Sequence, residues 1–270
     1  MPKTAIVTLA IGDWHHNTWK QYAEPSWREY AAQFGHDLIA LDQPLDTSER
    51  AQQRSPAWQK LLIPNLDWAR EYDRLIWLDC DIIVNNANAP NVADHVPAGK
   101  IGAVSTVSEP IVMTAARRAI MHPKFHSEWG MPSDFPAVIN TGVLVIEPRN
   151  DAALFQHVYD AYEDKGSPRW HYENRPLSWH IIDSGRAHWL DSRFNKTWGL
   201  DLHEYYSFLL KNLDLSDPDG RIKDCLRVSA AKAYFFHFAG AMHFMPLYPA
   251  GEILRERRYV HDAELGLLEI

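Results

Sequence analysis

Short apolar runs alternate along the chain with segments of helical periodicity, and this alternation predicts an α/β fold. The runs over Thr4–Ala10, His36–Leu41 and Arg74–Leu78 have the length and composition of buried strands. Between the first two, Trp19–Phe34 has helical spacing and is followed by Gly35, a residue type that commonly ends helices. Strands that alternate with helices in this way are typical of an open, mainly parallel sheet with helices on both faces.

The same alternation continues toward the C-terminus. Ser55-Pro56 predicts the start of a helix, with Ser as cap and Pro in the first turn, and Pro64 should break or kink that helix. The remaining predicted elements are strands at Ile101–Val107, Ala137–Ile146 and Tyr234–Phe238, helices at Ala152–Tyr162 and Pro176–Ile182, a polar loop at Asp214–Asp224 and a surface helix at Glu252–Ile270.

Composition narrows the class of protein. A chain of 270 residues with 46% hydrophobic residues can bury the core of one elaborated domain. The net charge of −8 argues against a long nucleic-acid groove, which is usually basic. Two cysteines, Cys80 and Cys225, make no disulfide framework and predict a reducing, cytoplasmic setting. No apolar stretch approaches the roughly 20 residues that span a membrane.

Two carboxylates stand where the most apolar strand ends. Asp79 and Asp81 follow Arg74–Leu78 and precede Ile82-Ile83-Val84. An Asp after a strand often caps a turn in solvent, but apolar residues on both sides favour partly buried carboxylates that need partners. Two carboxylates one residue apart at a strand end can converge on one hard cation, in the crevice where this type of sheet binds ligands. The pattern therefore predicts a metal site.

The segment Leu75–Val84 resembles the DxD segment of glycosyltransferases with the GT-A fold, particularly the family 8 type. Further segments occur in the same order as in that family, and the resemblance spans roughly Thr4 to His243. They are the first strand Ile6–Ala10, the basic helix Trp58–Leu62, the strand Ile139–Leu144 with its Asn140-Thr141-Gly142, the segment Glu173–Ser178, and His237-Phe238-Ala239-Gly240.

The resemblance implies a single catalytic domain over residues 1–270, with the Rossmann-like, nucleotide-diphospho-sugar transferase fold. Its nucleotide-binding half would be 1–107, its acceptor and sugar half 108–247, and a C-terminal helical extension 248–270. It implies a metal-dependent hexosyl- or pentosyltransferase that moves a sugar, with retention of configuration, from a nucleotide-sugar, expected to be a UDP-sugar. The acceptor would be a saccharide or another hydroxyl compound.

The resemblance also implies a third metal ligand, His237, beside Asp79 and Asp81. From the residues alone, His237 in a Phe-rich strand is more typical of a histidine satisfied within the core. Two carboxylates and one imidazole form a mixed oxygen and nitrogen set that suits Mn²⁺, or else Mg²⁺, better than Ca²⁺. Such an ion stabilises the charge that develops on a leaving diphosphate.

The donor nucleotide would contact a second group of residues. Trp14 offers a stacking face for the base, Lys60 a positive charge for a phosphate or a sugar hydroxyl, and His243 occupies the position where the family usually has a lysine near the diphosphate. The full predicted set is Thr8, Ala10, Trp14, Lys60, Asp79, Cys80, Gly240 and His243.

Asn140, Glu173 and Asn174 are the expected catalytic residues on the sugar side, and Asp183 is a weaker candidate. Two routes remain open for retention. In one, the leaving phosphate accepts the proton of the acceptor and no protein base is needed. In the other, a double displacement, a carboxylate or amide near C1 attacks the sugar, and Glu173 is the first candidate. The loops Ser105–Ser133 and Trp170–Asn174 are expected to shape the acceptor cleft.

Three other classes of protein also fit part of the pattern. A haloacid dehalogenase-type phosphatase uses an Asp-x-Asp after an apolar strand, but near the N-terminus and followed by a Thr. A metal-dependent sugar nucleotidyltransferase has a Gly-rich, basic phosphate loop after its first strand, where this chain has Ala10–His16. A non-catalytic sugar-binding module would need no diphosphate site. Release of nucleoside diphosphate from a nucleotide-sugar distinguishes the transferase from all three.

Overall fold

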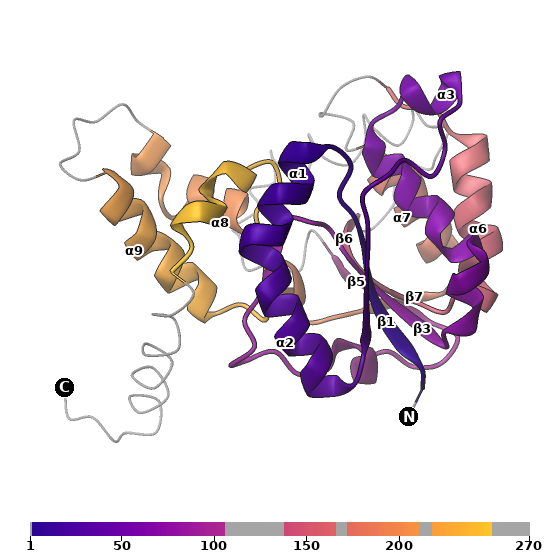
Figure 1. The fold of residues 1–270 in the computed structure, drawn as a ribbon, viewed down its shortest axis with the longest axis horizontal. Coiled ribbons are helices and arrows are strands. Elements are labelled where there is room, and N and C mark those ends of the chain that lie inside the picture. Colours follow the sequence, from indigo (N-terminus) through magenta and orange to yellow (C-terminus); the bar gives the residue numbers. More distant parts are fainter. Residues whose placement is uncertain (1, 106–137, 166–171, 211–217, 250–270) are drawn as a thin grey trace.

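A computed structural model describes residues 2–105, 138–165, 172–210 and 218–249. Figure 1 shows a central sheet with helices packed against both of its faces, and a smaller helical region that includes α8 and α9 on one side. The expected C-terminal helix Glu252–Ile270 lies outside the described residues. So do most of the loop Ser105–Ser133 and the first two residues of the loop Trp170–Asn174, both of which are expected to shape the acceptor cleft.

The central sheet has six strands in the order β2-β1-β3-β6-β5-β7. β3 is antiparallel to β6, and β6 is antiparallel to β5, whereas the other neighbouring pairs are parallel. Five strands therefore run in one direction and the sheet is mainly parallel, as predicted. The strands are β1 (Thr4–Leu9), β2 (Asp37–Leu41), β3 (Arg74–Leu78), β5 (Ile101–Ser105), β6 (Ile139–Ile146) and β7 (Ala187–Trp189).

A second, smaller sheet continues from the end of β3. Its order is β4-β9-β8, with bounds β4 (Ile82–Val84), β9 (Phe235–His237) and β8 (Lys196–Thr197). β4 is antiparallel to β9, and β8 is parallel to β9. This small sheet joins parts of the chain that are far apart in sequence.

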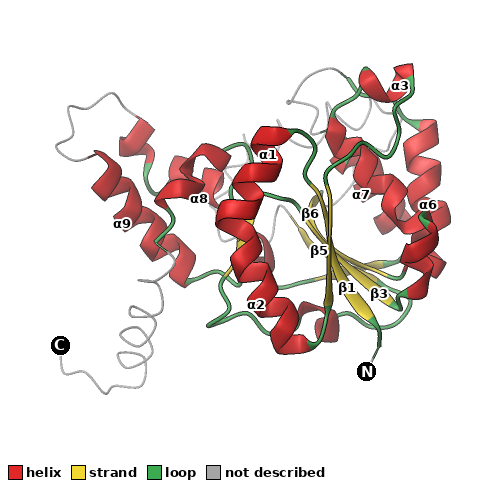
Figure 2. Cartoon of the chain, viewed as in Figure 1, coloured by secondary structure: helices red, strands yellow, loops and turns green. Residues whose placement is uncertain are grey.

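The helices lie on both faces of the central sheet (Figures 1 and 2). None of those in the described part of the chain has the length and apolar character needed to cross a membrane. The α-helices are α1 (Asp13–Thr18), α2 (Glu24–Phe34), α3 (Glu49–Gln52), α6 (Pro148–Ala161), α7 (Asn174–Asp183), α8 (Trp198–Glu204) and α9 (Pro218–Ala231). Shorter helices are a π-helix at Trp19–Ala23 and 3-10 helices at Pro56–Asn65, Asp67–Glu71, Val92–His95, Ser192–Asn195, Ser207–Leu210 and Met242–Leu247.

The two faces of the central sheet bury separate apolar clusters. Ile6 packs in one cluster with Trp27 of α2 and Phe235 of the small sheet. Its neighbour Val7 packs in the other with Trp58 and with Phe155 of α6. Because successive side chains of a strand point to opposite faces, the continuous apolar runs in the sequence fill both clusters.

One of two further predictions is confirmed and the other is wrong. The segment after Ser55 forms the predicted helix, of the 3-10 type, with the Ser55 side chain as its cap, Pro56 in its first turn, Pro64 in its last turn and Leu66 extended. Most of the predicted polar loop Asp214–Asp224 lies instead in α9, which begins at Pro218. Proline and glycine predict a loop, but proline is well tolerated in the first turn of a helix, where its missing N–H has no partner to lose.

Asp151, near the start of α6, provides a test of this packing. It is fully buried, accepts a hydrogen bond from the backbone N–H of Glu147 and pairs with Arg186. Burial is the main reason that the pKa of Asp151 rises from 3.8 to about 6. Because the folded-state pKa lies above the unfolded one, stability from this group is present in acid and is lost as the pH rises through about 6.

We therefore expect Asp151→Asn, which cannot ionise, to gain stability relative to the wild type as the pH rises. The gain between about pH 4 and about pH 7 should be up to about 3 kcal/mol, since each pKa unit corresponds to about 1.4 kcal/mol. Urea unfolding of both proteins at several pH values measures it. A difference that stays constant with pH would contradict this account.

Candidate metal site and pocket

The two aspartates lie in the turn that joins the two sheets. β3 ends at Leu78, Asp79 follows, and β4 begins directly after Asp81. The turn is held by its backbone, since the N–H of Asp79 donates to the carbonyl of Gly142 at 2.9 Å and that of Ile82 donates to the carbonyl of Asp79 at 3.1 Å. Both carboxylates therefore lie at the carboxyl end of β3, as predicted.

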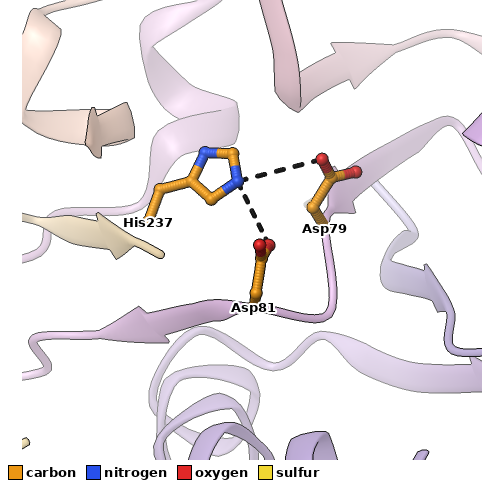
Figure 3. A group of neighbouring side chains, drawn as sticks. All are labelled: Asp79, Asp81 and His237. Carbon is orange, nitrogen blue, oxygen red and sulfur yellow. Dashed lines mark ion pairs between the residues drawn. The ribbon is translucent and has the colours of Figure 1, made fainter. Parts of the chain in front are cut away.

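The small sheet brings His237 to this turn. Ile82 of β4 is paired with His237 of β9, and the N–H of Phe238 donates to the carbonyl of Asp81 at 2.9 Å. Nε2 of His237 is 3.1 Å from Oδ1 of Asp81 and 3.9 Å from Oδ2 of Asp79 (Figure 3). One ligand atom from each of the three residues lies within 4.8 Å of the others, so the set fits a single metal ion.

Two further residues fix the orientation of the imidazole. Nδ1 of His237 is 2.8 Å from Oδ1 of Asn195, which is itself buried. An amide oxygen can only accept, so Nδ1 carries the proton and Nε2 is left for the carboxylates or an ion. Gly142 also lies against the ring, and an added Cβ there would be 2.4 Å from Cε1 of His237. Sequence reasoning did not identify Asn195, because only the folded chain places it there.

Asp81 and His237 each shift the pKa of the other so that both residues favour their charged forms. Burial by itself raises the pKa of Asp81, but the adjacent His237 outweighs it and holds that pKa below its ordinary value. Burial lowers the pKa of His237, whereas Asp81 and Asp79 raise it, and the net pKa is raised. The two carboxylates therefore strongly favour a positive charge at this point.

Lys60 and Glu173 form a buried ion pair beside the cluster. Nζ of Lys60 is 2.8 Å from Oδ1 of Asp79 and 3.0 Å from Oε1 of Glu173. Burial lowers the pKa of Lys60, but the two carboxylates raise it further and keep the ammonium charged. Glu173 is 2% exposed and its pKa is raised by burial despite Lys60. Its Oε1 also accepts a hydrogen bond from Thr141 at 2.8 Å.

A pocket of about 450 Å³ opens beside these residues, at the ends of β1 and β3. Of the predicted nucleotide-binding residues, six line it, and Asp81 does as well. Thr8 and Ala10 are instead buried and are not part of its wall. The six are Trp14, Lys60, Asp79, Cys80, Gly240 and His243.

The expected sugar-side residues lie behind this wall. Glu173 is not a lining residue and sits beyond Lys60. Asn140 accepts a hydrogen bond from the N–H of Gly142 at 3.1 Å, and Asn174 hydrogen-bonds Thr141. Asp183 lies exposed at the far end of α7. The structure thus groups Glu173, Asn174 and Thr141 together next to the pocket, and leaves Asp183 apart from them.

Neither a protein-family model nor a curated protein sequence matches this chain. Among solved structures, a glycosyltransferase involved in the glycosylation of the major capsid of PBCV-1 matches at 16% identity and a TM-score of 0.53, over 91% of this chain and 100% of that one. The galactosyltransferase LgtC, in complex with donor and acceptor sugar analogs, matches at 16% identity and a TM-score of 0.46, over 92% and 95%. Mouse xyloside xylosyltransferase 1 matches at 12% identity and a TM-score of 0.42, over 87% and 97%.

At this identity, the match to the PBCV-1 capsid glycosyltransferase establishes the fold and not the activity. It agrees with the fold that the resemblance in the sequence implies. The chain has the GT-A fold of the glycosyltransferases.

Proposed function

We propose that this protein is a metal-dependent glycosyltransferase that uses a nucleotide-sugar donor, expected to be a UDP-sugar. The observation that carries the proposal is the convergence of Asp79, Asp81 and His237 at the edge of a pocket at the carboxyl ends of β1 and β3. In open α/β sheets this edge is where ligands bind. The fold is the one that the PBCV-1 capsid glycosyltransferase has.

Asp79, Asp81 and His237 would hold the ion, for which Mn²⁺ or Mg²⁺ is the best candidate. The ion supplies positive charge for the diphosphate as it leaves. Asn195 supports this assignment because it leaves only Nε2 of His237 free to bind. Asp81 is largely shielded from solvent and faces Nε2 of His237 at 3.1 Å, so its charge needs a cationic partner.

The rest of the pocket fits a nucleotide. Trp14 lines it with about half of its surface exposed, and it can stack on a base. Gly240 and His243 lie on the same wall, and a protonated His243 would add positive charge near a diphosphate. Of the charged side chains on this wall, Asp79 and Asp81 are acidic and Lys60 is already paired, so a metal ion would be needed to receive a diphosphate.

The place of Glu173 favours one of the two routes to retention. A double displacement needs a nucleophile in contact with C1 of the sugar. Glu173 lies behind Lys60, off the pocket wall, and is held by Lys60 and Thr141. This supports the route in which the leaving phosphate takes the proton of the acceptor.

The test is donor hydrolysis without an acceptor. The protein is incubated with UDP-, GDP-, ADP- and dTDP-sugars, with Mn²⁺ or with EDTA, and released nucleoside diphosphate is measured. We expect slow, Mn²⁺-dependent release from one class of donor, because activation of the leaving group does not depend on the nucleophile.

Other products would point to other classes of protein. Release of inorganic phosphate or pyrophosphate would indicate a phosphatase or a nucleotidyltransferase. Binding of a donor with no release at high protein concentration would indicate a sugar-binding module. Either result would contradict the transferase.

A further inference from the structure

The buried Lys60 lies between two carboxylates, and only one of them belongs to the candidate metal site. Its Nζ is 2.8 Å from Asp79 and 3.0 Å from Glu173. The side chains of Lys60 and Glu173 are 5% and 2% exposed, so solvent screens these charges little. Together with Asp81, the group contains three carboxylates and one ammonium.

Asp79 divides its two oxygens between different partners. Oδ1 accepts hydrogen bonds from Lys60 Nζ and from Trp77 Nε1, both at 2.8 Å. Oδ2 faces Nε2 of His237 at 3.9 Å. An ion held at the Oδ2 side therefore competes with Lys60 for the charge of one carboxylate. Since the ammonium and the ion repel each other, Lys60 by itself would weaken metal binding.

Glu173 is placed to offset that repulsion. It contacts Lys60 without lining the pocket, and its other oxygen, Oε2, has no hydrogen-bond partner among the described residues. With Glu173 ionised, the three negative charges and one positive charge leave two negative charges, which match a divalent ion when His237 is neutral. Without Glu173, only one negative charge would remain.

We infer that Glu173 is a positioning residue whose charge balances Lys60, keeps Asp79 available as a ligand and so sets the affinity for the divalent ion. This inference rests on the proposed function, because it assumes that Asp79, Asp81 and His237 bind the ion. It assigns Glu173 a role in metal affinity in place of attack on the sugar.

The test is a pair of variants titrated with Mn²⁺ alone, with free Mn²⁺ followed by its electron paramagnetic resonance signal. Glu173→Gln keeps the shape of the side chain and leaves Lys60 paired with Asp79 only. We expect it to bind Mn²⁺ about 10- to 100-fold more weakly, the range found when a residue supporting a metal ligand is changed. The double variant Lys60→Met with Glu173→Gln removes both charges, and its affinity should return to within about threefold of the wild type.

Asp151→Asn is the matched control. It also removes a buried carboxylate paired with a cation, Arg186, but at the opposite end of the central sheet, beside the start of β3. Its Mn²⁺ affinity should equal that of the wild type. Thermal melting checks that each variant is folded. If Glu173→Gln does not fold, the Mn²⁺ affinity of the double variant is the deciding measurement.

Three other results would overturn this inference, and a fourth would contradict the proposed function. An unchanged Mn²⁺ affinity in Glu173→Gln overturns the inference, and so does a double variant that binds more than tenfold more weakly than the wild type. The same loss in Asp151→Asn would also overturn it, because the effect would not depend on Lys60. A wild-type protein that binds no Mn²⁺, with or without UDP, contradicts the proposed function itself.

Discussion

Asp81→Asn should abolish Mn²⁺-dependent binding of UDP while the protein stays folded. The side chain of Asp81 is 17% exposed, and its Oδ1 is 3.1 Å from Nε2 of His237. Asparagine has nearly the same shape but no charge, and a neutral amide is a much weaker ligand for Mn²⁺. In this variant Asp79 is the acidic residue left on the pocket wall and Lys60 is paired with it, so without the ion little positive charge remains there to hold a diphosphate.

We expect UDP affinity in saturating Mn²⁺ to fall at least about 100-fold, since changing even a supporting residue costs about 10- to 100-fold. Asp79→Asn should behave in the same way. Isothermal titration with UDP, in Mn²⁺ and in EDTA, measures the effect, and Asp151→Asn serves as the control that keeps wild-type heats. Titration heats that are unchanged in both variants would exclude these aspartates as metal ligands.

Gly142→Ala should disrupt the same site without touching a charge. A Cβ at residue 142 would lie 2.4 Å from Cε1 and 2.8 Å from Nδ1 of His237, and 3.2 Å from Oδ1 of Asn140. The ring cannot give way easily, because Nδ1 is held by Asn195 and the backbone of His237 is paired in β9. Either the ring moves off the aspartates or the strands separate slightly.

Overpacking of this kind costs about 1–3 kcal/mol of stability, and we expect Mn²⁺ affinity to fall about 10- to 100-fold as His237 is displaced. Thermal melting and Mn²⁺ titration measure the two effects. Gly199→Ala is the matched control, because its added Cβ meets its nearest atom at 3.5 Å, an ordinary contact, within α8. Equal Mn²⁺ affinities in Gly142→Ala and the wild type would show that Mn²⁺ binding does not depend on the present position of the His237 imidazole.

Local patterns in the sequence were sufficient for much of the fold. The strand Arg74–Leu78 was predicted with the bounds that it has, because four consecutive residues of a strand that is buried on both faces leave a continuous apolar run after Arg74. Gly35 was predicted to end a helix, and it follows α2 with a φ of 69°, a conformation that glycine adopts without strain. Such features depend on a few neighbouring residues, which is why they can be read without the structure.

The candidate site was only partly predictable, because its geometry depends on pairing between distant segments. The position of Asp79 and Asp81 followed from the end of one strand. The approach of His237 required the resemblance to a family, since nothing near it in sequence indicates that β9 pairs with β4. Asn195 was not predicted as a contact of His237, nor Glu173 as a partner of Lys60. Both contacts join residues separated by long stretches of chain.

The three candidate ligands also come from both sheets, and this has a consequence for cooperativity. Asp79 follows the central sheet, whereas His237 belongs to the small one, and more than half of the chain lies between Asp81 and His237. Residues that share an ion act as a cross-link, and a cross-link that closes a long loop restricts the unfolded chain most. Separation of β9 from β4 would then require release of the ion. Occupancy of the site would therefore decide whether the small sheet opens on its own or only together with the rest of the domain.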